Sequence, residues 1–152
     1  MDTVEQSTEN TLVLTRIFAA PRALVFSAWT DPERAAVWWG PQGFVTLSCR
    51  MDVRPGGSWR IRMRSPQGEI RTKAGVYREI VPPERLVFTW AWEDADAVRG
   101  YETLVTVTFE DHGHATKLRL HQAIFESATA REAHREGWTS CLDRFAAYLT
   151  EA

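Results

Sequence analysis

The sequence has few cysteines, no long apolar run and no excess of charge of one sign. Its two cysteines, Cys49 and Cys141, are far apart and neither belongs to a Cys-x-x-Cys pair, which excludes a disulfide scaffold and a zinc ribbon. No apolar run approaches the roughly 18 residues that a membrane span needs. The 18 Lys and Arg against 20 Asp and Glu give a net charge of -2, whereas a nucleic-acid-binding domain is normally basic. We therefore expect no membrane span and no nucleic-acid partner.

Motifs for cofactors and for catalysis are equally scarce. The chain has no dinucleotide fingerprint and no glycine-rich phosphate loop before a helix. His112 and His114 fall in a predicted hairpin turn without a third ligand nearby, so we interpret them as solvated turn residues. Ser140, His134 and Asp143 have the residue types of a hydrolytic triad, but they share one predicted helix and no nucleophile elbow precedes them. The sequence predicts no cofactor, no metal and no catalytic residue, and it favours a binding protein over an enzyme.

What the chain does contain is one ordinary domain that is rich in aromatic residues. Its 152 residues are 44% hydrophobic and 25% charged, as in a single globular domain. Residues 1–10 are polar and are predicted to be a flexible tail, with a single domain over 11–152. The start lacks the charged and apolar regions of a signal peptide, which predicts a cytoplasmic protein. Seven Trp, seven Phe and three Tyr favour a hollow or amphipathic interior.

Hydrophobic periodicity predicts the element order β-α-α-β-β-β-β-β-β-α. The first strand is expected over residues 11–19, and a short helix over 21–28. A second short helix should follow Asp31 as its N-cap, because Pro32 then takes the first helical position. The last helix is predicted to begin at a capping box formed by Thr129 and Glu132 and to run for about twenty residues.

Period-two alternation is clearest in the second and third predicted strands. Residues 45–53 should form a strand that places Val45, Leu47, Cys49, Met51 and Val53 on one face. The next strand sets Trp59, Ile61 and Met63 against a row formed by Arg60, Arg62 and Arg64. Sequential hairpins imply a curved antiparallel sheet of about seven strands, whose apolar face the long C-terminal helix must cover. The predicted fold is an α+β helix-grip with two short helices after the first strand.

Four stretches of the chain resemble a known family. They are FAAPRALVFSAWTDPERAAVWWGP, DVRPGGSWRIRMRSPQGE, GVYREIVPPERLVFTW and GWTSCLDRFAAYL. Together they are similar to the activator-of-heat-shock-ATPase-like (Aha-type) branch of the START/SRPBCC superfamily, over roughly residues 11–150. The resemblance implies a START-like, pollen-allergen-like fold that encloses a cavity for hydrophobic small molecules or lipids. No catalytic motif is shared across this range, so the resemblance is more specific for fold than for function.

The candidate ligand site is the apolar set expected to face inward, because binding sites are concave, mostly apolar and marked by a few polar groups. The ligand would be a hydrophobic, lipid-like or aromatic small molecule, and the alternative is a solidly packed core. Gly137, in the middle of the last helix, predicts a close approach there by the sheet or by a ligand. Loop 93–96 and Tyr101 are expected near the entrance. The candidates are Trp59, Ile61, Met63, Tyr77, Phe88, Trp90, Trp92, His134, Trp138 and Leu142.

Two other functions stay open. The first is an enzyme similar to polyketide cyclases and aromatases, in which the cavity orients a reactive chain and His134 or Tyr77 moves protons. The second is a chaperone-activating or other protein-docking module that uses the row Arg60, Arg62 and Arg64, although such a row is more often the solvated face of an antiparallel sheet. A homodimer or another protein partner also stays open.

Overall fold

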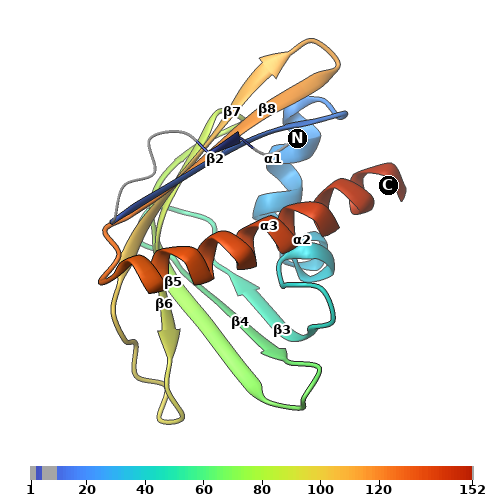
Figure 1. Cartoon of the computed structure of the whole chain (residues 1–152). Helices are drawn as coiled ribbons and strands as arrows, with labels where there is room; N and C mark the ends of the chain where they lie inside the picture. Colours follow the sequence, from blue (N-terminus) through green and yellow to red (C-terminus); the bar gives the residue numbers. More distant parts are fainter. Residues whose placement is uncertain (1–2, 5–9, 152) are drawn as a thin grey trace.

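The computed structural model describes residues 3–4 and 10–151, and it shows one antiparallel sheet curved around a long helix (Figure 1). The strand order across the sheet is β1-β2-β8-β7-β6-β5-β4-β3. The helices are α1 (Arg22–Thr30), α2 (Pro32–Trp38) and α3 (Ala128–Glu151). The strands are β1 (Thr3–Val4), β2 (Thr11–Phe18), β3 (Val45–Met51), β4 (Ser58–Arg64), β5 (Ile70–Val81), β6 (Arg85–Glu93), β7 (Thr103–His112) and β8 (Ala115–Ala123).

The predicted order of elements and the helix-grip architecture are confirmed. Strands β2 to β8 are the seven that the sequence predicts, and α3 lies across the concave face of the sheet (Figure 1). Strand β1 lies within the segment predicted to be a tail. It is two residues long and pairs with β2, so that Thr3 lies opposite Thr15. Most of residues 1–10 lies outside the described residues. Within the described part of the chain, no helix combines the length and apolarity that crossing a membrane requires.

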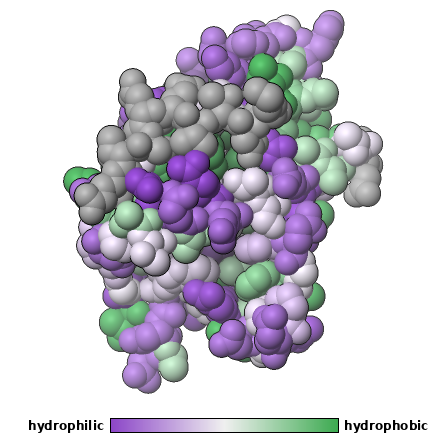
Figure 2. All heavy atoms as spheres, in the orientation of Figure 1, coloured by the Kyte–Doolittle hydropathy of each residue, from purple (hydrophilic) through white to green (hydrophobic). Residues whose placement is uncertain are grey.

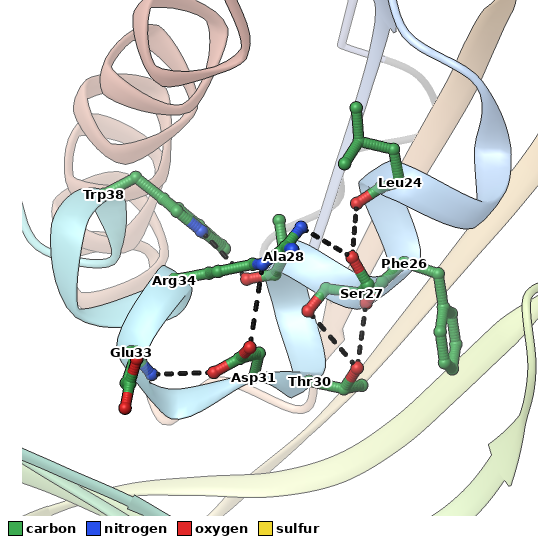
Figure 3. Close-up of polar contacts among 9 residues, drawn as sticks. All are labelled: Leu24, Phe26, Ser27, Ala28, Thr30, Asp31, Glu33, Arg34 and Trp38. Carbon is green, nitrogen blue, oxygen red and sulfur yellow. Dashed lines mark hydrogen bonds and ion pairs between the residues drawn. The ribbon is translucent and has the colours of Figure 1, made fainter. Parts of the chain in front are cut away.

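A rigid corner joins α1 to α2 (Figure 3). The Asp31 carboxylate accepts a hydrogen bond from the Glu33 amide at 2.9 Å, so Asp31 is the N-cap that the sequence predicts. The indole of Trp38 donates back across the corner to the carbonyl of Ala28 at 3.1 Å. Pro21 is the N-cap of α1 rather than a helical residue, so that helix begins one residue later than predicted. The corner fixes both short helices against one end of α3.

The predicted apolar face of β3 is wrong in its first half. A bulge after Thr46 shifts the register of β3 against β4. Val45 and Leu47, before and at the bulge, are 50% and 39% exposed, whereas Cys49 and Met51 beyond it pack against the core. A bulge adds one residue to a strand and so reverses the faces on either side of it.

Gly75 in β5 is a site of close approach between two strands. Trp59 lies opposite Gly75 in the β4–β5 ladder, and its indole crosses that glycine to donate to the carbonyl of Thr89 in β6 at 3.1 Å. A Cβ on Gly75 would overlap that carbonyl. The missing side chain therefore lets one tryptophan bridge two strands.

The start of α3 differs from the prediction. The Ser127 hydroxyl accepts a hydrogen bond from the amide of Ala130 at 3.1 Å, so the helix begins two residues earlier than the capping box at Thr129 would place it. Glu132 does not reach back to the helix start, because it pairs with Arg135 at 3.1 Å instead. The predicted capping box is wrong, whereas the long amphipathic helix is confirmed.

The aromatic residues gather inside the molecule. Six of the seven tryptophans are buried, and Trp92 is partly buried against the same core. The face shown in Figure 2 is mainly hydrophilic, and its hydrophobic residues form small separate groups. The high tryptophan content therefore builds the interior between the sheet and α3.

Candidate functional site

One end of this interior is solid, and we call it the packed end. It lies where α1 and α2 meet the C-terminal half of α3, and its aromatic rings pack directly against one another. Trp29 lies 4.7 Å from Trp38 between ring centres, and Phe145 lies 4.6 Å from Trp38 and 4.9 Å from Phe18. Phe109 of β7 meets Trp29 edge to face at 6.0 Å. Tilted and edge-to-face contacts at these distances are typical of a close-packed aromatic core.

The other end contains a cavity of about 330 Å³, and we call it the hollow end. The N-terminal half of α3 covers it on one side, together with Trp39, Pro41 and Phe44 at and after the end of α2, and side chains of β4 to β7 line the other side. Its rim includes the exposed side chains of Arg71, Tyr101 and Glu126. This volume is at the lower end of the range of small-molecule sites, and roughly twice the 150 Å³ of a cavity that admits benzene.

Trp138 of α3 separates the two ends. Its ring stacks on Trp29 of the packed end at 5.8 Å and also borders the cavity. Its indole donates to the side-chain oxygen of Gln122 at 2.8 Å, and the nitrogen of Gln122 donates to the Thr103 hydroxyl at 2.8 Å. Gln122 is fully buried, so these two hydrogen bonds satisfy the oxygen and the nitrogen of its side chain. They also fix the orientation of the Trp138 ring at the border of the cavity.

Lys73 is a buried cation in the cavity wall. Its side chain projects from the inner face of β5, is 4% exposed, and places the ammonium 4.9 Å from the centre of the Trp39 ring. Burial lowers its pKa from 10.5 to about 8, so it is still mostly protonated at pH 7. Among the described residues it has no hydrogen-bonding or ion-pair partner. The wall therefore carries a positive charge that no carboxylate in the described part of the chain balances.

Arg71 lies two residues before Lys73 on the same face of β5. Its guanidinium stacks on the Trp92 ring at 4.1 Å, and its side chain is exposed at the rim. This contact holds Trp92 across the edge of the cavity, and Trp92 meets Trp90 edge to face at 4.7 Å. A cation and two rings thus form this side of the cavity.

His134 faces the cavity from α3. Its ring lies 4.4 Å from Trp90 and 5.1 Å from Phe125 between ring centres. Burial first, and then the charges of Lys73 and Arg71, lower the pKa of His134 from 6.5 to about 4. The imidazole is neutral at pH 7, so it can exchange hydrogen bonds with a ligand but is not a proton donor of the imidazolium type.

The structure divides the ten predicted ligand-site residues into two groups. Met63, Trp90, Trp92, His134 and Trp138 border the cavity. The other five are packed against further side chains and do not border it, because their positions on the sheet and on α3 fall within the solid part of the core. These five are Trp59, Ile61, Tyr77, Phe88 and Leu142.

Tyr77 illustrates the second group. It is 2% exposed and packs edge to face on Phe88 at 6.3 Å. Burial raises the pKa of its hydroxyl well above the usual value. A buried phenol without access to the cavity does not fit a proton-transfer role there.

Sequence reasoning missed Lys73 and Arg71, although a signal for both was present. Tyr77 was a predicted ligand-site residue, and residues two, four and six positions before it on a strand share its face. That parity places Gly75, Lys73 and Arg71 on the inner face. Lys and Arg side chains are mostly exposed to solvent in proteins. Their residue types therefore argue against the inner face, although the alternation along β5 places them there.

The reason suggested for Gly137 is corrected in part. A Cβ built on Gly137 meets nothing within 4 Å, so the sheet does not approach the helix there. Gly137 borders the cavity instead. Of the two close approaches that the sequence allows at this position, the approach of the sheet is therefore wrong. Tyr101, predicted near the entrance, does lie at the rim.

The other candidate groups of the sequence have ordinary surroundings. His112 lies 3.5 Å from Glu110 at the hairpin end of β7, and no group of three potential metal ligands occurs in residues 3–4 and 10–151. Arg60, one of the three arginines in the row on the outer face, forms an ion pair with Glu93 at 3.0 Å. Ser140 accepts a hydrogen bond from the Gln42 amide at 2.8 Å, so its hydroxyl holds the loop after α2.

A curved antiparallel sheet around a C-terminal helix, with an apolar cavity between them, defines the START-like helix-grip class. Within that class, the family model described as "Activator of Hsp90 ATPase homolog 1-like protein" matches residues 19–150, and the chain belongs to this family. No curated protein matches the chain.

Solved bacterial structures agree with this assignment. The AHSA1 protein of Silicibacter pomeroyi is 31% identical, with a TM-score of 0.83 over 92% of this chain and 97% of that one. A protein from Chromobacterium violaceum is 30% identical, with a TM-score of 0.79 over 91% and 95%. A protein from Mycobacterium smegmatis is 25% identical, with a TM-score of 0.85 over 100% and 99%.

Proposed function

We propose that the protein binds an apolar small molecule in the cavity at the hollow end. The observation that supports this most strongly is the contrast between a cavity of about 330 Å³ and a core that is close-packed elsewhere. Protein interiors rarely leave such a space without a use, and this one has aromatic walls and a few polar groups, as ligand sites do. A body about the size of two fused aromatic rings fits the volume.

The test is calorimetric titration with 2-naphthamide, a neutral two-ring compound. The wild-type protein should bind it, and Gly137→Leu should weaken binding at least tenfold, because the new side chain enters the open space beside Trp138. Ala147→Leu is the matched control, because it enlarges an exposed residue of the same helix away from the cavity. Equal binding by all three proteins would contradict a ligand at the hollow end.

Native mass spectrometry of the freshly purified protein tests occupancy by a natural ligand. We expect an added mass that is lost on denaturation and that belongs to an apolar compound. The same added mass on purified Gly137→Leu would contradict its placement in the cavity.

The two alternative functions have weaker support. In the cyclase-like alternative, Tyr77 does not border the cavity, and neutral His134 packs between two rings, so neither of the proposed proton carriers is well placed. In the docking alternative, Arg60 is engaged by Glu93. Binding without turnover is therefore the function that the geometry favours.

A further inference from the structure

The charge of Lys73 is the feature that an apolar ligand leaves unexplained. An ammonium taken out of water is costly unless an opposite charge or several hydrogen bonds replace its hydration. Lys73 is 4% exposed, and its contact with the Trp39 ring is the interaction that the described residues supply. A cation–π contact replaces only part of the lost hydration. The rest of its surroundings must come from what enters the cavity, and an opposite charge would stabilise the ammonium more than water does.

The protein groups around Lys73 do not balance it. Those that act most strongly on its charge are the thiols of Cys141 and Cys49 and the guanidinium of Arg144. Burial raises the pKa of Cys49 to about 11 and raises that of Cys141 as well, so both thiols are neutral at pH 7. Arg144 is itself a cation. The carboxylate that borders the cavity, Glu126, is exposed at the rim.

We propose that the cavity binds a monoanionic carboxylate, with its carboxylate on the Lys73 ammonium and its apolar body between Trp90 and Trp138. This inference rests on the proposed function, because it names the chemical class of the ligand at the same site. Lys73 holds the charged group on the inner wall, and the neutral ring of His134 lies on the opposite wall, contributed by α3.

The number of charges selects a carboxylate over a phosphate. A phosphate monoester carries close to two negative charges at neutral pH, whereas the inner wall offers one buried ammonium. Arg71 is the next cation on the same face, but it is exposed and stacked on Trp92. A phosphate on Lys73 would keep an excess charge in an apolar space, whereas one carboxylate gives a neutral pair.

The experiment compares 2-naphthoate with 2-naphthamide, which have the same ring body with and without the charge. In the wild-type protein at pH 7, 2-naphthoate should bind at least tenfold more tightly. In Lys73→Met, which keeps the length of the side chain and removes the charge, this preference should disappear while the affinity for 2-naphthamide stays within threefold. Arg62→Met is the matched control, and it should keep the preference because Arg62 lies on the outer face of β4 and does not border the cavity.

Each contrary outcome has a separate meaning. Equal affinities of the two compounds in the wild-type protein would overturn this inference and leave the proposed function standing. A preference that survives Lys73→Met, or a parallel loss of both compounds in that variant, would overturn the role of Lys73. Binding of neither compound to the wild-type protein would contradict the proposed function, and with it this inference.

A pH series on the wild-type protein provides a test that needs no variant. The preference for 2-naphthoate should fall between pH 8 and pH 10.5 as Lys73 loses its proton, with 2-naphthamide unchanged. Among its neighbours, the imidazole of His134 is already neutral in this range, the pKa of the Cys49 thiol is about 11, and burial raises the pKa of Cys141, so Lys73 is the first of these four groups to change its charge as the pH rises above 8. A constant preference across this range would overturn the inference.

Discussion

The packed end and the hollow end are made of the same kinds of residue, and they differ in what covers them. At the packed end, α1 and α2 place Trp29 and Trp38 against Phe145, so the rings close on one another. At the hollow end, a single helix spans the concave sheet, and Gly137 leaves its facing side open. Aromatic content therefore does not distinguish a core from a binding site here. The number of helices that cover each end does distinguish them.

The charges follow the same division. Among the described residues, the buried charged residue is Lys73, which lies in the wall of the hollow end with neutral His134 across from it, whereas the rings packed around Trp29 contain none. Close packing excludes ions because no water or counter-charge can reach them. A cavity tolerates an ion when a ligand or solvent can reach it. The two ends should consequently respond very differently to mutation and to pH.

The largest expected difference is in the effect of truncation. Phe145→Ala should lower the free energy of unfolding by roughly 4 kcal/mol, because Phe145 is fully buried among Phe18, Trp38 and Tyr148. Trp92→Ala should cost about 1 kcal/mol, because that ring borders the cavity and is partly exposed. Urea denaturation of both variants measures this. Similar losses would erase the distinction between the two ends.

The next largest effect concerns Lys73 in the unliganded protein. The folded state holds its proton less tightly than the unfolded chain, since burial lowers the pKa from 10.5 to about 8. Unfolding therefore takes up a proton in that window, and the free energy of unfolding rises as the pH increases from about 8 to 10.5. Lys73→Met should be more stable than the wild type at pH 7, and its advantage should shrink by as much as roughly 3 kcal/mol by pH 10.5.

Urea denaturation of the wild type and Lys73→Met at pH 7 and pH 10.5 measures that change. An advantage that is the same at both pH values would mean that Lys73 is well solvated or paired. It would then no longer distinguish the hollow end.

His134 should give an effect in the acid range. Its pKa is lowered from 6.5 to about 4 in the folded protein, so its contribution to stability is present above pH 6.5 and is lost as the pH falls towards 4. After allowance for its partial exposure, we expect a loss of roughly 2 kcal/mol between pH 7 and pH 4. His134→Phe keeps the ring contacts with Trp90 and Phe125 and should lack this component.

The same histidine reports on its neighbours. Because Lys73 is one of the charges that lower the pKa of His134, Lys73→Met should raise that pKa in an NMR titration. An unchanged pKa would show that the two side chains do not share the cavity.

The smallest effect is expected at Gly137. A Cβ there meets nothing within 4 Å, so Gly137→Ala adds helix propensity without a clash. The free energy of unfolding should rise by about 0.5–1 kcal/mol. Thermal unfolding by circular dichroism measures this shift. Destabilisation instead would mean that the space beside α3 is filled in solution.

The fold was largely predictable because its strands alternate clearly. Trp59, Ile61 and Met63 in β4 are buried at the alternate positions that period two predicts, and they define the inner face of the sheet. The bulge in β3 was not predictable, because Val45 and Leu47 continue the apolar alternation although the backbone reverses them. A pattern of residue types records which side chains prefer burial. It does not reveal a β-bulge, in which one strand has an extra residue without a partner on the neighbouring strand.

The candidate site was predictable only in part, for a related reason. Trp90 and Trp59 both face inward, but whether an inward residue meets a cavity or another ring depends on where α1 and α2 pack. Long-range contacts decide this, and the local sequence does not contain them. Lys73 needed a different step, which was to follow the parity of β5 back from Tyr77 in spite of the polar residue type.

The most direct test of the division between the two ends uses the indole N–H signals of the tryptophans in a nitrogen-15 NMR spectrum, each assigned by a Trp→Phe variant. On addition of 2-naphthamide, the signals of Trp90, Trp92 and Trp138 should move, because these rings border the cavity. The signals of Trp38 and Trp59, whose indoles are bonded to the carbonyls of Ala28 and Thr89, should stay in place. Shifts spread over all the indoles, or confined to the packed end, would contradict a binding site between the sheet and the N-terminal half of α3.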